Sequence, residues 1–243
     1  MTPAQEPGPW QSWGVTDVGM ARSLNEDAFL DLPGAGLWMV ADGMGGHAHG
    51  ELASALAVQS LEGFDPPANL AARVDRVEDA LLGADEAIRE LAARKGRRQI
   101  GSTVALLLAH EHHVVCLWAG DSRIYRWRTG TLEQLTRDHA YVEELLEMGL
   151  IEADEARHHP QGNIVTRALG ASERLYLDAE VFALEPGDAF LLCSDGLTRE
   201  LEDEDIAATL AEQPPPTTCQ ALVDRALARG RHDNTTVVRA RFS

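Results

Sequence analysis

The sequence contains few cysteines, few basic residues and no long hydrophobic run. Its three cysteines are odd in number and form no C-x-x-C pair, so neither a disulfide framework nor a zinc knuckle is predicted; they are Cys116, Cys193 and Cys219. A reducing cytoplasm is therefore the expected setting. Apolar stretches such as residues 104–109 are far too short to cross a bilayer, and no membrane association is expected.

Basic residues are scarce relative to acidic ones. The chain has 21 Lys and Arg against 39 Asp and Glu, a formal net charge of −18. This balance opposes binding to nucleic-acid phosphates and to anionic lipid surfaces, so neither is an expected partner. Residues 1–12 have no basic region followed by an apolar one, and they are interpreted as a short lead-in rather than a signal peptide.

The composition is typical of one globular enzyme domain. With 243 residues, of which 44% are hydrophobic, the chain can bury a substantial core, and we expect a single domain over residues 13–243. Apolar and alternating patterns predict strands at 13–18, 37–41, 103–109, 113–119, 123–127, 175–183, 189–193 and 235–239.

Helices are expected between these strands. Apolar residues from Leu70 to Leu91 alternate spacings of four and three, which predicts a long helix packed on a sheet, with a coiled coil as the competing interpretation. Another helix should precede it, after Gly45-Gly46, and further helices are expected at 140–148, 203–210 and 218–229. Short turns between strands 103–109, 113–119 and 123–127 favour antiparallel hairpins over a doubly wound parallel sheet.

Four aspartates in Gly- or Asn-containing turns are the candidate functional residues. Three of them adjoin an apolar run of strand length, where loops collect functional groups. Converging carboxylates need a compensating charge, and their hard oxygens suit Mg²⁺ or Mn²⁺. Each Asp-Gly or Asp-Asn pair alone is common in ordinary turns. Together they predict a metal hydrolase; they are Asp42, Asp121, Asp195 and Asp233.

The order of these motifs carries a resemblance. Along the chain stand Arg22-Ser23-Leu24-Asn25-Glu26-Asp27, Asp42-Gly43-Met44-Gly45-Gly46-His47, Gly101-Ser102-Thr103, Gly120-Asp121-Ser122-Arg123, Asp195-Gly196 and Asp233-Asn234. This pattern, from about Gly14 to Val238, closely resembles the metal-dependent serine/threonine protein phosphatases of the protein phosphatase 2C type, in particular stand-alone bacterial members. The resemblance implies an α+β fold, a four-layer αββα sandwich with two central antiparallel sheets flanked by helices, and a mobile flap at about 140–170.

The resemblance also assigns metal ligands. It implies that Asp42 bridges two Mn²⁺ or Mg²⁺ ions, with the Gly43 carbonyl as a further ligand, and that Asp195 and Asp233 complete the ligands of the first ion. Glu26 and Asp27 would hold the second ion or its waters. By the same resemblance Asp121 would help to hold a third, weaker ion. Two such ions can activate a bridging water for in-line attack on phosphorus.

Other residues are assigned to substrate and proton transfer. Arg22 matches the phosphate-binding arginine of the family, and a guanidinium fork suits two phosphate oxygens. Met44 stands where eukaryotic relatives have a histidine, and a thioether cannot donate a proton. The general acid is then His47 or a metal-bound water, although His47 could equally stabilise the turn. His139 is expected to be structural, and Arg123 could bind phosphate or pair with nearby carboxylates.

Two alternatives remain open in the sequence. The segment from Cys193 to Arg199 fits C-x-x-G-x-x-R, the phosphate loop of cysteine-dependent phosphatases, but its neighbours do not favour a thiolate. The chain could also be a non-catalytic, phosphopeptide-binding pseudophosphatase. The expected function is hydrolysis of phosphoserine and phosphothreonine in proteins by a cytoplasmic monomer that opposes a cognate serine/threonine kinase in signalling. Similar proteins act in the control of type VI secretion, but no residue identifies the pathway.

Overall fold

The computed structural model describes residues 9–45, 49–96, 100–152, 155–156, 159–230 and 233–243. Its strands are β1 (Trp10–Asp17), β2 (Asp27–Leu32), β3 (Leu37–Met44), β4 (Gly101–Ser102), β5 (Val104–His110), β6 (His113–Ala119), β7 (Arg123–Arg128), β8 (Thr131–Gln134), β9 (Asp178–Ala183), β10 (Ala189–Cys193) and β11 (Thr235–Phe242). Its helices are α1 (Gly50–Gln59), α2 (Leu70–Arg94), α3 (Tyr141–Glu147), α5 (Asp195–Thr198), α6 (Asp203–Glu212) and α7 (Pro215–Arg229).

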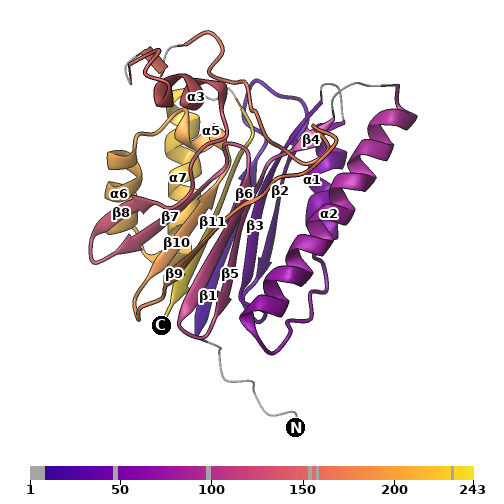
Figure 1. The fold of residues 1–243 in the computed structure, drawn as a ribbon. Coiled ribbons are helices and arrows are strands. Elements are labelled where there is room, and N and C mark those ends of the chain that lie inside the picture. The colour runs from indigo at the N-terminus through magenta and orange to yellow at the C-terminus, as the bar shows by residue number, and fades with distance from the viewer. Residues whose placement is uncertain (1–8, 46–48, 97–99, 153–154, 157–158, 231–232) are drawn as a thin grey trace.

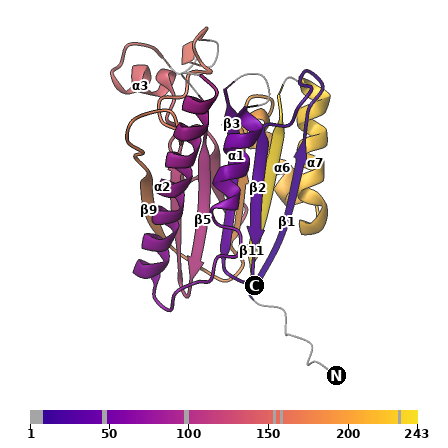
Figure 2. The same cartoon turned by 90° about the vertical axis from the view of Figure 1, so that its right-hand side faces the viewer.

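The strands form two antiparallel sheets that lie face to face (Figure 1). The five-stranded sheet has the order β1-β11-β10-β7-β8, and the six-stranded sheet has the order β2-β3-β5-β6-β9 with β4 paired to β3. Helices α1 and α2 cover the outer face of the six-stranded sheet, and α6 and α7 cover the outer face of the other sheet (Figure 2). The fold is therefore the expected four-layer αββα sandwich of the α+β class.

Alternation along the central strands explains why their sequences are almost continuously apolar. In β5, Leu106 and Leu108 face α1 and α2, whereas Leu107 faces the other sheet. In β10, Leu192 lies between the sheets and Leu191 packs toward α6 and α7. Because both faces of these strands are buried, neither face requires polar residues.

The long helix α2 packs on a sheet, as the first interpretation of its apolar stripe predicted. Val77, Leu81 and Ile88 are fully buried against the six-stranded sheet, so the coiled-coil alternative is wrong. The side chain of Asn69 accepts a hydrogen bond from the Ala72 amide and caps the start of the helix. No helix in the described part of the chain has the length and hydrophobicity that crossing a membrane requires.

Several boundaries differ from expectation. Strands β6 and β7 do not form a hairpin: β6 pairs with β5 and β9, whereas β7 pairs with β8 and β10. The turn between them, Gly120 to Ser122, carries the chain from one sheet to the other. Strand β1 begins at Trp10, because its pairing with β11 continues to Phe242. Helix α7 begins within the proline run, at Pro215, since proline is tolerated in the first helical turn.

Candidate active site

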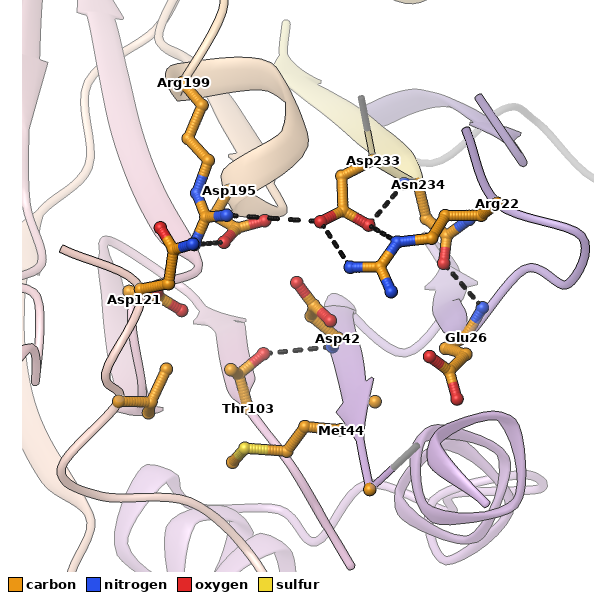
Figure 3. A pocket seen from close by; sticks show the side chains of 14 residues that line it. Arg22, Glu26, Asp42, Met44, Thr103, Asp121, Asp195, Arg199, Asp233 and Asn234 are labelled. Atoms are coloured by element: carbon orange, nitrogen blue, oxygen red, sulfur yellow. Dashed lines mark hydrogen bonds and ion pairs between the residues drawn. The ribbon is translucent and has the colours of Figure 1, made fainter. Parts of the chain in front are cut away.

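The expected site residues converge at one end of the sandwich, where segments of both sheets meet. All of them except Asp27, and His47, which lies outside the described residues, line a cavity of about 230 Å³ (Figure 3). Asp42 comes from the six-stranded sheet, Asp195 and Asp233 adjoin strands of the other sheet, and Asp121 lies on the turn between the sheets. The complete lining is Arg22, Glu26, Asp42, Gly43, Met44, Gly45, Thr103, Asp121, Asn163, Val165, Asp195, Arg199, Asp233 and Asn234.

Asp42 lies within a strand rather than in a turn. Strand β3 continues through Gly43 to Met44, and the Asp42 backbone is fixed on both sides by Thr103. The Asp42 amide donates to Thr103 Oγ1 at 2.9 Å, and the Thr103 amide donates to the Asp42 carbonyl at 2.8 Å. The Asp42 carboxylate can therefore point into the cavity from a rigid backbone (Figure 3).

Glycine follows Asp42 because the backbone is crowded there. A Cβ atom on Gly43 would lie 2.1 Å from the carbonyl oxygen of Gly50, the first residue of α1, and 2.6 Å from that of Glu26. The Gly43 amide donates to the Glu26 carbonyl at 3.0 Å. One side-chain oxygen of Glu26 accepts a hydrogen bond from the Gly50 amide at 3.1 Å, so Glu26 supports the start of α1 as well as lining the cavity.

The second Asp-Gly pair is built in the same way. A Cβ atom on Gly196 would lie 2.0 Å from the carbonyl oxygen of Asn234, which brings Asp195 and Asp233 to adjacent backbones. The Asn234 side chain joins this segment to the N-terminal loop: it donates to the carbonyls of Val18 and Leu24 and accepts from the Glu26 amide at 2.8 Å. Asn234 is thus a positioning residue, which explains the Asp-Asn motif.

Asp27 lies behind the cavity and is not among the residues that line it. It begins strand β2 directly opposite Asp42. Ser194 Oγ donates to Asp27 Oδ2 at 2.7 Å and accepts from the Thr236 amide at 2.9 Å. Asp27 Oδ1 is buried and has no hydrogen-bond partner among the described residues. Such an orphaned carboxylate oxygen is a polar atom that a cation or its bound water would satisfy.

The pKa values of several carboxyl groups in the site are raised, as expected where negative charges converge. Burial, followed by neighbouring aspartates that include Asp195, raises the pKa of Asp27 and that of Asp121, each to about 7. Burial and the nearby Asp27 and Asp195 raise the pKa of Asp42 well above its usual range. These groups cannot all be ionised at neutral pH unless a positive charge lies among them.

Two arginines supply part of that charge. Arg22 forms a bidentate pair with Asp233, with Nε to Oδ1 at 3.0 Å and Nη2 to Oδ2 at 2.9 Å. Arg199 pairs with Asp195, four residues before it. Asp42 has no such arginine partner in the described structure, and it occupies the centre of the view in Figure 3. Arg199 was anticipated only within the cysteine-loop alternative; its helical spacing from Asp195 is the signal that indicates this pairing.

The donor set fits a divalent cation. Hard carboxylate and carbonyl oxygens from several strand ends, one of them orphaned, are the ligands that Mg²⁺ and Mn²⁺ prefer. Within the described ranges, no three His, Cys, Asp or Glu side chains form a ready-made chelating group. The pairing of Asp195 and Asp233 with arginines accounts for this, since each carboxylate turns toward a guanidinium instead of a common point.

Two further expectations concern residues outside the metal-ligand set. Arg123 donates to both oxygens of Asp138, at distances from 2.8 to 3.0 Å, and also to Tyr125, so it is a structural partner of carboxylates. His139 accepts from the Gly120 amide, contacts Asp178 at 3.1 Å and stacks on Trp118. It is structural, as predicted. His47 lies outside the described residues.

The cysteine-dependent alternative does not fit the structure. Cys193 is fully buried at the end of β10, and burial raises the pKa of its thiol to about 12. A nucleophilic cysteine requires the opposite shift and access to substrate. Arg199, the other residue of that pattern, pairs with Asp195.

Comparisons with known proteins identify the family to which the chain belongs. The family model described as protein phosphatase 2C matches residues 20–228. The serine/threonine protein phosphatase PstP of Mycobacterium tuberculosis is 35% identical over 226 residues, which are 92% of this chain and 43% of that protein. The chain therefore spans less than half of the length of this relative.

Two solved structures superpose closely. PppA, described as a key regulatory component of T6SS in Pseudomonas aeruginosa, is 43% identical, with a TM-score of 0.90 over 96% of this chain and 98% of that one. The catalytic domain of PstP in complex with 2 manganese ions is 32% identical, with a TM-score of 0.85 over 96% of this chain and 97% of that one. The chain belongs to the protein phosphatase 2C family, a family of metal-dependent serine/threonine phosphatases.

Proposed function

We propose that this chain hydrolyses phosphoserine and phosphothreonine in proteins by metal-dependent catalysis, as a single catalytic domain over residues 13–243. The observation that carries the proposal is the convergence of Asp42, Asp195 and Asp233, from both sheets, with Arg22 at the same cavity. Serine/threonine phosphatase relatives and a manganese-bound structural neighbour support it.

Each group has a role in this proposal. Asp42, the Gly43 carbonyl, Asp195 and Asp233 would hold the central Mn²⁺ or Mg²⁺, Glu26 and Asp27 would hold the second ion or its waters, and Asp121 would share a third, weaker ion with Asp195. When bound, such cations polarise the phosphoryl group and lower the pKa of water. Bound cations at these ligands would explain how so many carboxylates can line one cavity.

Arg22 is placed to bind the phosphoryl group. Its side chain is half exposed at the cavity and already donates through Nε and Nη2 to a carboxylate, a planar anion whose two oxygens resemble two phosphate oxygens in spacing. A phosphate that enters the cavity can take over these donors, or use the remaining N–H groups of the guanidinium. Because no described histidine lines the cavity, the general acid is His47 or a water molecule in this proposal.

The cellular role follows from the same proposal. We expect a monomeric cytoplasmic enzyme that opposes a serine/threonine kinase in signal transduction. The description of the Pseudomonas aeruginosa relative makes regulation of T6SS the first pathway to test. A pseudophosphatase is disfavoured because none of the central carboxylates is lost and all of them line the cavity.

A phosphothreonine-peptide assay with matched metal conditions tests the proposal. We expect turnover with Mn²⁺ or Mg²⁺, none in EDTA, and recovery when excess Mn²⁺ is restored. A titration of tryptophan fluorescence with the same metal, possible with five tryptophans, measures binding separately. Metal binding without turnover would indicate a sensor, and turnover in chelator would overturn the metal mechanism.

A further inference from the structure

Residues 163–170, the last part of the region expected to form the flap, run from the cavity to helix α2. Asn163 and Val165 line the cavity, and Val165 forms an isolated bridge with Ala140. Farther along, Leu169 exchanges both backbone hydrogen bonds with Ser102, at 2.9 and 3.0 Å. In Figure 1 this orange segment reaches β4 and α2 before it descends into β9. One wall of the cavity is therefore continuous with a contact on α2.

That contact is made by a buried acid. Asp85 is 1% exposed on the inner face of α2, between the apolar residues Leu81 and Ile88. Its Oδ1 accepts a hydrogen bond from the Gly170 amide at 2.7 Å, and its Oδ2 accepts from Arg89 Nε at 2.9 Å. A buried carboxylate is costly unless it is paired, and here its two oxygens have two different partners.

Gly170 fits this place because of its conformation and its close packing. Its φ is +75°, which side chains rarely adopt, and a Cβ atom would lie 2.2 Å from Ile88 Cγ2 and 2.7 Å from the Ile100 carbonyl oxygen. The backbone therefore lies directly on α2, where the Asp85 carboxylate is the acceptor for its amide. The close packing of Gly170 and its hydrogen bond to Asp85 together fix the end of segment 163–170.

Segment 163–170 is connected by backbone pairing to the strand that carries Asp42. Ser102, which pairs with Leu169, also pairs with Gly43 in β3, and Thr103 holds the Asp42 backbone. We propose that Asp85 is a positioning residue for substrate binding: by holding the Gly170 amide it fixes segment 163–170, of which Asn163 and Val165 line the cavity, relative to Asp42. This inference rests on the proposed phosphatase function.

Three substitutions separate the two bonds of Asp85. Asp85→Leu fills the volume but removes the acceptor, Asp85→Asn keeps an acceptor for Gly170 but loses the charge, and Arg89→Met removes only the ion pair. Asp188→Leu is a matched control, because Asp188 is also 1% exposed, pairs with an arginine, Arg128, and accepts a loop amide, that of Glu185, in the turn between β9 and β10. If Asp85→Leu does not fold, Asp85→Ser, whose hydroxyl is too short to reach Gly170, replaces it.

The experiment compares the kinetic constants for a large substrate, a phosphothreonine peptide, with those for a small one, p-nitrophenyl phosphate. Losing one hydrogen bond that orders the wall should raise KM for a phosphothreonine peptide about three- to tenfold in Asp85→Leu, with kcat/KM for p-nitrophenyl phosphate changed by less than about twofold. Asp85→Asn and Arg89→Met should stay near wild type, and Asp188→Leu should lower the melting temperature without such a difference between the two substrates. Binding of a peptide that carries a non-hydrolysable phosphonate should weaken in parallel.

Three other outcomes contradict the inference, and a fourth contradicts only the phosphatase proposal. Unchanged kinetics with a lower melting temperature would make Asp85 a purely structural residue, and an equal loss for both substrates would remove its role at the wall. A full effect in Asp85→Asn would assign the role to the ion pair instead of Gly170. If wild type binds the phosphonate peptide but turns over nothing, the phosphatase proposal fails, while the binding comparison still tests Asp85.

Discussion

The two Asp-Gly pairs of the cavity are alike in the crowding around their glycines and different in the charges around their aspartates. In both pairs the glycine lies against a neighbouring carbonyl, Gly43 against Gly50 and Gly196 against Asn234, so no side chain fits. Asp195, however, has a cationic partner in Arg199. The neighbouring groups that most raise the pKa of Asp42 are all carboxylates.

This difference shows how one motif can serve two purposes. Asp195 begins helix α5, so a residue four positions later can reach back to it. Asp42 lies in the central strand β3, where neighbours in sequence point away and cannot neutralise it. Among the described residues Asp42 has no arginine of its own, so a bound metal ion is the charge best placed to keep it ionised. We therefore expect Asp42 to be the residue most dependent on bound metal.

The largest effect should come from neutralising Asp42, the aspartate without an arginine partner in the described structure. Asp42→Asn should reduce phosphopeptide turnover by more than about a hundredfold, which exceeds the loss typical of residues one step removed from a metal. Asp195→Asn should also be severe, but metal affinity should fall less than in Asp42→Asn, since Asp195 is already shared with Arg199 and contributes less to cation binding. Turnover and calorimetric metal binding of the two variants test this order, which equal metal affinities would contradict.

The arginines should differ in the next experiment. Charge-assisted hydrogen bonds are worth about 1.5–3 kcal/mol, so Arg22→Ala should lower kcat/KM by roughly ten- to a hundredfold without weakening metal binding, since the substitution also frees Asp233. Arg199→Ala should mainly raise the metal affinity, because Asp195 is then free to bind the cation. Steady-state kinetics over a range of Mn²⁺ concentrations separates the two effects. Unchanged kinetics for Arg22→Ala would leave it as a surface partner of Asp233.

A smaller effect is expected in the pH dependence of stability without metal. The pKa values of Asp27 and Asp121 are raised to about 7 in the folded protein, above the value of about 3.9 in an unfolded chain. The folded state then binds more protons between these values, so its stability decreases as pH rises from about 4 to about 7. Melting temperatures in EDTA should fall over this range, and Mn²⁺ should reduce the fall. A rise with pH in EDTA would contradict the assignment.

The smallest effect on activity is expected at Cys193. Cys193→Ser places a hydroxyl in the core, so the melting temperature should decrease, but activity per folded molecule should remain within about twofold because sulfur takes no part in the reaction. Circular dichroism and active-site titration with metal normalise the comparison. A folded, metal-binding and inactive Cys193→Ser variant would revive the cysteine mechanism.

Local patterns predicted the parts of the fold in which local and tertiary structure agree. The apolar runs of β3, β5, β6 and β10 and the stripe of α2 are all visible in sequence, because their burial repeats at the period of the element. Strand β2 was not anticipated, since it begins with Asp27 and contains Asp31, whose carboxylate is satisfied by Trp38 and Ser12 from neighbouring strands. No short window contains those partners.

The site shows the same limit. The Asp-Gly and Asp-Asn motifs predicted which carboxylates would line the cavity, but the depth of Asp27 and the pairing of Arg22 with Asp233 depend on contacts between distant segments. The turn at Asp121 was expected to close a hairpin, because nothing in three residues distinguishes a hairpin from a crossing between sheets. Asp85 was hidden for a similar reason: its partner Gly170 lies 85 residues away.

The crossing at Asp121 has a mechanical consequence. At this end of the molecule the two sheets are joined by covalent connections that include the turn at Asp121 and by hydrogen bonds such as that from Ser194 to Asp27, whereas farther inside apolar packing dominates the contact between them. An ion that is shared by Asp42 and Asp195 would be a cross-link between the two sheets. Removing it should loosen the open end of the sandwich, so that the chemistry of the cavity and the rigidity of the fold are governed by one binding equilibrium.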